Sequence, residues 1–228
     1  MKVSIFGKNS EEISALVKSF GLEITDKNPE VIFSYGGDGT LIESEFAFPG
    51  IPKLLLRGSK ICKRCSPLSN EEILKRLAAG QYETEKRIKL EAMVKGEIIA
   101  GVNDIVVRNQ DHRHAMRYHL WLNNHQIDNM ENEIIGDGIV VATPFGSTGY
   151  YRSITDSFFE LGIGLAFNNS TEQVDHMVLP ETSEIKLQIV RGPAIVYADN
   201  QDKGILVAEG DEVKIKKSKQ VFNLVRIL

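Results

Sequence analysis

Apolar and polar positions in the first part of the chain follow the pattern of strands that alternate with helices. Three apolar runs have the length of buried strands and end at turn residues: residues 2–6, 31–35 and 53–56. Residues 10–20 begin with a serine and two acids and then repeat apolar side chains at helical spacing, and residues 70–77 form a second helical pattern that Gly80 ends. We therefore predict an α/β domain with a Rossmann-like parallel sheet over residues 1–82.

The pattern changes after Gly80, where apolar and polar residues alternate as they do in half-buried strands. These stretches are residues 87–94, 98–100, 104–107, 119–122, 138–142, 185–189, 194–197, 205–207 and 213–215. A helical pattern recurs over residues 153–161. Together they predict a mostly-β, sandwich-like C-terminal domain over residues 83–220, with antiparallel strands. The tail, residues 221–228, can return to the first domain.

Length and composition are those of an ordinary globular protein. The chain has 228 residues, 42% of them hydrophobic, and 27 Lys and Arg against 31 Asp and Glu give a net charge of −4. This composition excludes a disordered chain, and a mildly acidic chain is a poor general binder of nucleic acid. No apolar run reaches the ~20 residues of a membrane span, and the N-terminal run breaks at Gly7, too early for a signal peptide. We expect a cytoplasmic protein that binds neither nucleic acid nor a membrane.

Two groups of side chains resemble metal or redox sites. Cys62 and Cys65 have a spacing that suits a redox pair or half of a zinc site, but no second cysteine pair completes a zinc site. We expect two reduced thiols beside a turn. His112, His114 and His119 are close in sequence but lack an acid or cysteine at ligand spacing, which favours a polar loop and strand over a metal site.

The most informative motif is Gly36-Gly37-Asp38-Gly39-Thr40, directly after a predicted strand. Its glycines allow a sharp bend that exposes backbone N–H groups, and a helix expected from about Thr40 favours a phosphate at its N-terminus. The carboxylate of Asp38 would repel a phosphate unless it binds a cation or accepts a proton. The motif therefore indicates phosphoryl transfer, with a tight turn as the alternative. It is neither a G-x-G-x-x-G motif nor a P-loop.

Two further segments place polar groups beside apolar strands. Asn103-Asp104 interrupts an apolar run and can bind ribose hydroxyls or an amide, although a β-turn or bulge is the favoured explanation of this pair alone. In residues 136–151, a buried strand runs into a Pro/Gly turn rich in hydroxyls. There, Tyr150 can stack on a flat base, and Thr148 and Ser153 can reach phosphate or ribose oxygens. The alternative is a hairpin turn.

The three segments together resemble the NAD kinase family, over about residues 31–153. G-G-D-G-T alone is shared with phosphofructokinases and with diacylglycerol and sphingosine kinases. The Asn-acid pair followed by D-G-x-x-V-x-T-P-x-G-S-T-x-Y is similar to NAD kinases in particular. The later strands match more loosely and end in Asp199-Asn200-Gln201, where the family has a D-x-Q turn. The length resembles that of a compact microbial or archaeal member.

The resemblance implies an activity and its requirements. A phosphoryl group passes from ATP or polyphosphate to the 2′-hydroxyl of the adenosine ribose of NAD, which gives NADP. A divalent cation, expected to be Mg²⁺, bridges the donor phosphates. Lys60, Lys63 and Arg64 form a basic run that either faces the donor or lies in a solvated loop. A lipid kinase of the diacylglycerol type would instead need an apolar mouth, and a non-catalytic NAD sensor would not need Asp38.

The resemblance also implies roles for individual residues. Asp38 becomes the proton acceptor, within a phosphate loop of Gly36, Gly37, Gly39 and Thr40. Asp137 matches an acid that contacts NAD, often across a subunit interface, which implies a homodimer or homotetramer. The full set expected to bind NAD is Asp38, Gly39, Asn103, Asp104, His114, Asp137, Thr148, Gly149, Tyr150, Tyr151, Arg152, Ser153 and Gln201.

Overall fold

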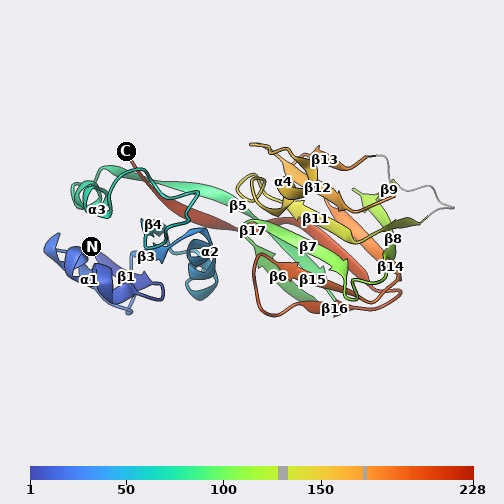
Figure 1. The fold of residues 1–228 in the computed structure, drawn as a ribbon, viewed down its shortest axis with the longest axis horizontal. Coiled ribbons are helices and arrows are strands. Elements are labelled where there is room, and N and C mark those ends of the chain that lie inside the picture. The colour runs from blue at the N-terminus through green and yellow to red at the C-terminus, as the bar shows by residue number, and fades with distance from the viewer. Residues whose placement is uncertain (128–132, 172–173) are drawn as a thin grey trace. The chain divides into compact units, whose positions relative to one another are not determined.

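The chain forms two compact units, each with its own core. The computed structural model describes residues 1–127, 133–171 and 174–228. Unit 1 comprises residues 1–87 and 220–228, and unit 2 comprises residues 88–219. Two long strands contribute to both units: β5 (Tyr82–Val94) and β17 (Glu212–Ile227) (Figure 1).

Unit 1 is an α/β domain built on a parallel sheet. Its strands lie in the order β17-β4-β3-β1-β2, and every paired neighbour is parallel. The elements are β1 (Lys2–Phe6), α1 (Ser10–Ser19), β2 (Glu23–Ile24), β3 (Val31–Gly36), α2 (Asp38–Ala47), β4 (Lys53–Arg57) and α3 (Asn70–Ala78). Strand residues such as Phe33 and Leu56 pack against Val17 of α1 and Leu74 of α3 in one core. The predicted α/β fold is confirmed.

The register of two strands positions the glycine motif. Gly36, the last residue of β3, pairs with Arg57, the last residue of β4. Gly58 then donates its N–H to the carbonyl of Gly36 at 3.0 Å. Because parallel strands end at the same edge of a sheet, the turn after β3 and the loop after β4 begin side by side, and ligands bind at such edges in α/β sheets.

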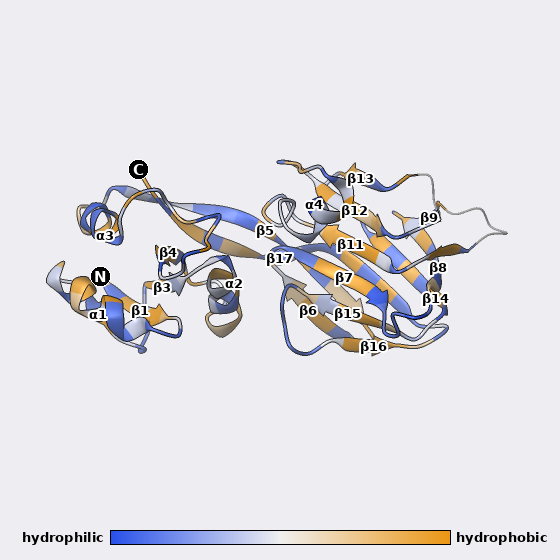
Figure 2. Ribbon diagram, viewed as in Figure 1, coloured by the Kyte–Doolittle hydropathy of each residue, from blue (hydrophilic) through white to orange (hydrophobic). Residues whose placement is uncertain are grey.

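Unit 2 consists of two antiparallel sheets with a core between them. One sheet runs β10 (Ile134–Gly136), β8 (Met116–Leu122), β14 (Ile185–Arg191), β17, β5 and β6 (Glu97–Gly101), with β9 (His125–Gln126) beside β8. The other runs β13 (His176–Leu179), β12 (Ile163–Asn168), β11 (Gly138–Ala142), β7 (Asp104–Asn109), β15 (Ala194–Ala198) and β16 (Ile205–Val207). Figure 2 shows the hydrophobic runs along β7 and β11, and residues of both sheets meet in one core. This confirms the mostly-β, sandwich-like domain.

A short helix, α4 (Tyr150–Thr155), covers the other face of the second sheet. Its Tyr151 packs against Val106, Val140 and Ala166 in a small separate core. All five residues of β11 are buried, because the strand has neighbours on both faces. None of the helices in the described part of the chain combines the length and apolarity that crossing a membrane requires.

The helix predicted over residues 153–161 was placed wrongly. It begins at Tyr150 and ends at Thr155, because Asp156 has the left-handed φ of 51°. The hydroxyl of Thr155 then accepts the N–H of Ser157 at 3.2 Å, which replaces the next helical hydrogen bond. The apolar residues that follow therefore do not continue the helix.

A buried ion pair lies within unit 1. Lys53 Nζ is 2.6 Å from Glu45 Oε2, and both side chains are at most 1% exposed. The ammonium also donates to the carbonyls of Phe48 at 2.7 Å and Ile51 at 2.5 Å, while Glu45 Oε1 accepts the N–H of Gly50 at 3.2 Å. These bonds fix the turn between α2 and β4.

We predict that Lys53→Met destabilises the protein by about 3–5 kcal/mol, because it leaves the buried Glu45 carboxylate without its cation. The double variant Glu45→Leu/Lys53→Met should recover most of that loss. Scanning calorimetry measures both effects, with the exposed Lys18→Met as a control. A single variant as stable as the unmodified protein would contradict this account.

Candidate active site

Close packing explains two of the three glycines in the motif after β3. A Cβ on Gly36 would lie 2.3 Å from the hydroxyl oxygen of Thr40, and a Cβ on Gly37 would lie 2.9 Å from the carbonyl oxygen of Ile61. A Cβ on Gly39 would meet nothing within 4 Å. Gly39 therefore leaves open space beside the first turn of α2, where helix N–H groups lack intrahelical partners and favour an anion.

The helix begins earlier than predicted, and this places Asp38 in its first turn. Gly37 caps α2, and the first helical hydrogen bond runs from the N–H of Leu41 to its carbonyl at 3.2 Å. The Asp38 carboxylate accepts the N–H of Arg64 on Oδ1 at 3.0 Å and the N–H of Lys63 on Oδ2 at 3.2 Å. One donor on each oxygen orients the carboxylate and leaves further acceptor capacity for a ligand.

The expectation of two reduced thiols was wrong, because Cys62 and Cys65 form a disulfide. The tight turn between them brings the Cα atoms of Cys62 and Cys65 to 5.5 Å, within the usual range for a disulfide. Of the neighbouring basic run, Lys60 and Lys63 are exposed, whereas Arg64 is half-buried. Burial lowers the pKa of the Arg64 guanidinium, and the nearby charge of Asp38 opposes this shift.

In unit 2, the Asn103-Asp104 pair and the hydroxyl-rich turn contact each other directly. Thr143 donates its N–H to the carbonyl of Asn103 at 2.8 Å and its hydroxyl to the carbonyl of Val102 at 2.7 Å. A Cβ on Gly146 would lie 2.0 Å from the carbonyl oxygen of Asn103. The second and third motifs of the sequence therefore pack directly against each other.

Asp199 holds the backbone of residues 102–104, and this role was missed in the sequence. Its carboxylate accepts the N–H groups of Val102 at 2.7 Å, Asn103 at 2.6 Å and Asp104 at 3.0 Å. Two residues later, Gln201 donates its side-chain amide to the carbonyl of Ala100 at 3.0 Å. The D-x-Q turn was visible in the sequence, but it could not reveal partners nearly one hundred residues away.

Burial and charge act together on the two neighbouring carboxyl groups. Burial, and then the charge of Asp199, raise the pKa of Asp104 to about 7. Burial also raises the pKa of Asp199, but its three amide hydrogen bonds and Lys89 oppose that shift. We therefore place the negative charge on Asp199. Beside them, the side-chain oxygen of Asn103 is buried and has no hydrogen-bond partner in the described part of the chain.

Asp137 and His114 lie at the opposite end of β11. Asn109 donates its side-chain amide to Asp137 Oδ1 at 3.1 Å and to the carbonyl of His114 at 2.9 Å. Asn169 donates to Asp137 Oδ2 at 3.2 Å. Because a strand rises about 3.4 Å per residue, the length of β11 separates Asp137 from the Asn103 end by about 17 Å. One copy of the chain does not bring these two groups together.

The predicted residues around α4 differ in exposure. The positions with exposed side chains or backbone are Thr148, Gly149, Arg152 and Ser153. Tyr150 is half-buried, and its hydroxyl accepts the side-chain amide of Asn168 at 3.2 Å. Tyr151 is fully buried, with its ring edge against Phe159 at a centroid distance of 5.1 Å, so its side chain belongs to the core.

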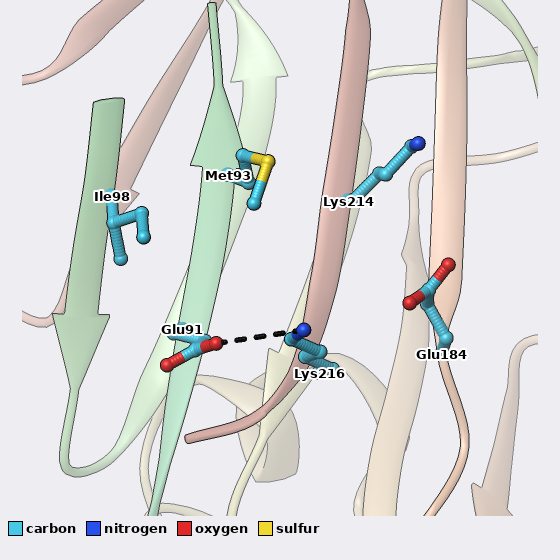
Figure 3. A pocket seen from close by; sticks show the side chains of 6 residues that line it. All are labelled: Glu91, Met93, Ile98, Glu184, Lys214 and Lys216. Atoms are coloured by element: carbon cyan, nitrogen blue, oxygen red, sulfur yellow. Dashed lines mark ion pairs between the residues drawn. The ribbon is translucent and has the colours of Figure 1, made fainter. Parts of the chain in front are cut away.

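Two other features do not coincide with these segments. A hollow of ≈ 220 Å³ on unit 2 is lined by Glu91, Met93, Ile98, Glu184, Lys214 and Lys216, none of them a predicted site residue (Figure 3).

In the described ranges, no group of three or more His, Cys, Asp or Glu side chains is arranged to hold a metal ion. His112 instead contacts Arg108 at 2.7 Å, and His119 lies against the Trp121 ring.

We predict that Asp104 makes unit 2 less stable as pH rises. The folded state binds the Asp104 proton more tightly than the unfolded state does, because the pKa of Asp104 is raised on folding. The protonated side chain therefore stabilises the fold fully below the unfolded pKa of 3.8, and this contribution is lost as pH rises through the folded pKa of about 7. Asp104→Asn should remove a few kcal/mol of this dependence. Urea unfolding at pH 5 and pH 8, followed by the fluorescence of Trp121, measures it. The exposed Asp202→Asn should keep the dependence, and an unchanged slope in Asp104→Asn would refute the prediction.

The chain is similar in sequence to one family model and to named relatives. The family model described as ATP-NAD kinase C-terminal domain matches residues 102–227. The chain is 28% identical over 258 residues to an NAD kinase of Sulfurisphaera tokodaii, covering 99% of this chain and 95% of the relative. It is 25% identical over 237 residues to an NAD kinase of Methanothermobacter thermautotrophicus, covering 100% and 82%.

Solved structures share the fold. A yeast NADH kinase complexed with NADH superimposes with a TM-score of 0.84 at 16% identity and covers 100% of this chain and 84% of the yeast chain. An NAD kinase from Archaeoglobus fulgidus in complex with ATP gives a TM-score of 0.80 at 22% identity, with 100% and 94% covered. At these identities the likeness establishes the fold. The family model spans more than half of the chain, and the chain therefore belongs to the NAD kinase family.

Proposed function

We propose that the protein transfers a phosphoryl group from ATP or polyphosphate to the 2′-hydroxyl of the adenosine ribose of NAD and so makes NADP. The observation that carries the proposal is the position of the Asp38 carboxylate. Asp38 lies in the first turn of α2, beside the open space at Gly39, and two backbone amides of the loop after β4 hold its carboxylate. A carboxylate repels a bound phosphate, so its presence in a loop suited to phosphate is explained if it accepts a proton during the reaction. Family membership supports the choice of NAD as the acceptor.

The chemistry that this geometry supports is an in-line displacement. The ribose oxygen forms a bond to the transferred phosphorus as the bond from that phosphorus to the leaving phosphate oxygen breaks. The hydroxyl is a weak nucleophile while it keeps its proton, so Asp38 accepts that proton. Its two amide hydrogen bonds leave lone pairs on both oxygens for the incoming hydroxyl.

The amino end of α2 suits the donor phosphates. Open space at Gly39 admits an anion, and the helix dipole favours negative charge there. A divalent cation, expected to be Mg²⁺, would supply charge neutralisation between the donor phosphates. Mg²⁺ is typically bound by one or two carboxylates plus phosphate oxygens and needs no larger protein cage. Asp38 fits that limited requirement, since its carboxylate has unused acceptor capacity.

Unit 2 supplies the groups that we propose to bind NAD. The unpartnered oxygen of Asn103 can accept a hydroxyl or amide proton of the dinucleotide. Asp104, with its raised pKa, lies beside it and can donate or accept near neutral pH. The ring of Tyr150 can stack on a base, and the exposed Thr148 and Ser153 add hydroxyl groups beside it.

One assay tests the activity and separates it from the alternatives. The protein is mixed with NAD, Mg²⁺ and either ATP or polyphosphate, and NADP is measured. NADP formation with either donor is the expected result. Binding of NAD by calorimetry with no NADP from either donor would identify a non-catalytic NAD sensor, and phosphorylation of diacylglycerol in micelles in place of NAD would identify a lipid kinase.

Asp38→Asn should lower kcat by about 10²–10⁴-fold, the contribution typical of a general base, while NAD binding is kept. Asparagine keeps the size of the side chain and one carbonyl oxygen but removes its basicity. Steady-state kinetics give kcat, and calorimetry gives the affinity for NAD. Glu43→Gln, an exposed change on the same helix, serves as the control and should leave kcat unaltered. Near-normal turnover in Asp38→Asn would make Asp38 a turn residue.

Tyr150→Ala provides the complementary result. Loss of a stacking ring should raise KM for NAD by about five- to tenfold with little change in kcat. The opposite split between kcat and KM in the two variants therefore separates the base from the binding surface. A Tyr150→Ala variant with normal KM would show that this ring only packs against its neighbours.

We also propose that the protein acts as a homodimer or homotetramer. The support is the family resemblance, in which the acid at the Asp137 position often contacts NAD across a subunit interface, together with the distance of about 17 Å along β11 between Asp137 and Asn103. Such an assembly should have closed symmetry. Light scattering at micromolar concentration tests this, and a fully active monomer would disprove it.

A further inference from the structure

The loop after β4 lies directly on the glycine motif. Residues 58–69 contain no helix or strand, and within them the carbonyl of Ile61 packs where a side chain on Gly37 would stand. The loop also provides both amide donors to the Asp38 carboxylate, from Lys63 and Arg64. The position of this carboxylate therefore depends on a segment that has no regular backbone ladder of its own.

The disulfide closes that segment around the two donors. Cys62 and Cys65 flank Lys63 and Arg64 on either side, so the covalent ring contains both of the amides that hold Asp38. The N–H of Cys65 also points to the sulfur of Cys62 at 3.1 Å. Each amide then keeps its direction, because the backbone on both sides of it is tied.

The sulfur of Cys62 is itself a neighbour of Asp38. It lies 3.4 Å from Asp38 Oδ1, and in the disulfide it carries no proton to donate. After reduction the same sulfur is either a thiol, which can donate to Oδ1, or a thiolate, which repels it. Reduction therefore changes the surroundings of the carboxylate both by loosening the ring and by changing the sulfur.

We propose that the Cys62–Cys65 disulfide is a positioning element for Asp38 and that its reduction by a dithiol lowers the rate of phosphoryl transfer. The reductant is a small dithiol or a protein with a vicinal thiol pair. Its two thiols lose two electrons and two protons and close into a disulfide, while Cys62 and Cys65 each gain one electron and one proton. The effect on rate rests on the proposed function of Asp38 as the base.

Kinetics before and after reduction test the effect on rate. The protein is treated with dithiothreitol until two thiols per chain react with a thiol reagent, and NADP formation is then measured. We expect kcat to fall about tenfold or more, since a misplacement of about 1 Å can cost about 100-fold, while KM for NAD changes less than about twofold. Unchanged or increased kcat with both thiols free would overturn the proposal.

Two variants separate positioning from a general effect of the reagent. Cys62→Ser/Cys65→Ser should resemble the reduced protein in kcat and should not respond to dithiothreitol. If the reagent slows this variant as much as the unmodified protein, the proposal is wrong. Asp38→Asn should lose most of its sensitivity to reduction, because the group that the ring positions no longer acts as a base.

A measurement that needs no activity distinguishes the failure of this proposal from the failure of the proposed function. Hydrogen–deuterium exchange should show Lys63 and Arg64 amides protected in the oxidised protein and less protected after reduction or in Asp38→Ala. Equal exchange in both redox states would refute the positioning role even if NADP is made. Faster exchange after reduction in a protein that makes no NADP would keep the positioning role and reject the kinase activity.

Discussion

Hydrogen bonds from backbone amides to carboxylates are the interaction on which the candidate residues of each unit depend. In unit 1, the amides of Lys63 and Arg64 hold Asp38, and in unit 2, three consecutive amides hold Asp199. Hydrogen bonds to an ionised acceptor are shorter and stronger than neutral ones, so a carboxylate can fix a turn that has no ladder of its own. In both cases the donors come from a segment distant in sequence.

The two carboxylates use this interaction for different ends. Asp199 is almost fully buried and its oxygens are occupied by the amides of residues 102–104, so it shapes the backbone that carries Asn103. Asp38 is only partly buried and receives one donor on each oxygen. Its carboxylate keeps further acceptor capacity, and the neighbouring Gly39 has open space beside it, which suits Asp38 to contact a substrate.

Glycines at close backbone contacts complete the arrangement. The carbonyl of Ile61 lies so close to Gly37, and the carbonyl of Asn103 so close to Gly146, that a Cβ at either glycine would collide with it. Each contact joins a motif recognised in the sequence to a second segment: the cysteine loop in unit 1 and the Asn-acid pair in unit 2. The motifs are therefore local in sequence, but their environment is made by neighbours from elsewhere in the chain.

The sequence by itself determined the fold class and the chemistry-bearing motifs. Apolar periodicity is a local property, so it revealed the parallel sheet of unit 1 and the strands of unit 2, and the order of the three motifs indicated the family. It could not place the end of α4, because the left-handed backbone at Asp156 is not encoded in helical spacing.

Only the tertiary structure decided which groups surround the motifs. The amides on Asp38 and Asp199, the disulfide of Cys62 with Cys65, and the burial that raises the pKa of Asp104 all arise when distant segments pack together. The physical reason is that hydrogen bonding, desolvation and sulfur–sulfur proximity depend on distances in space, whereas residue patterns report only spacing along the chain.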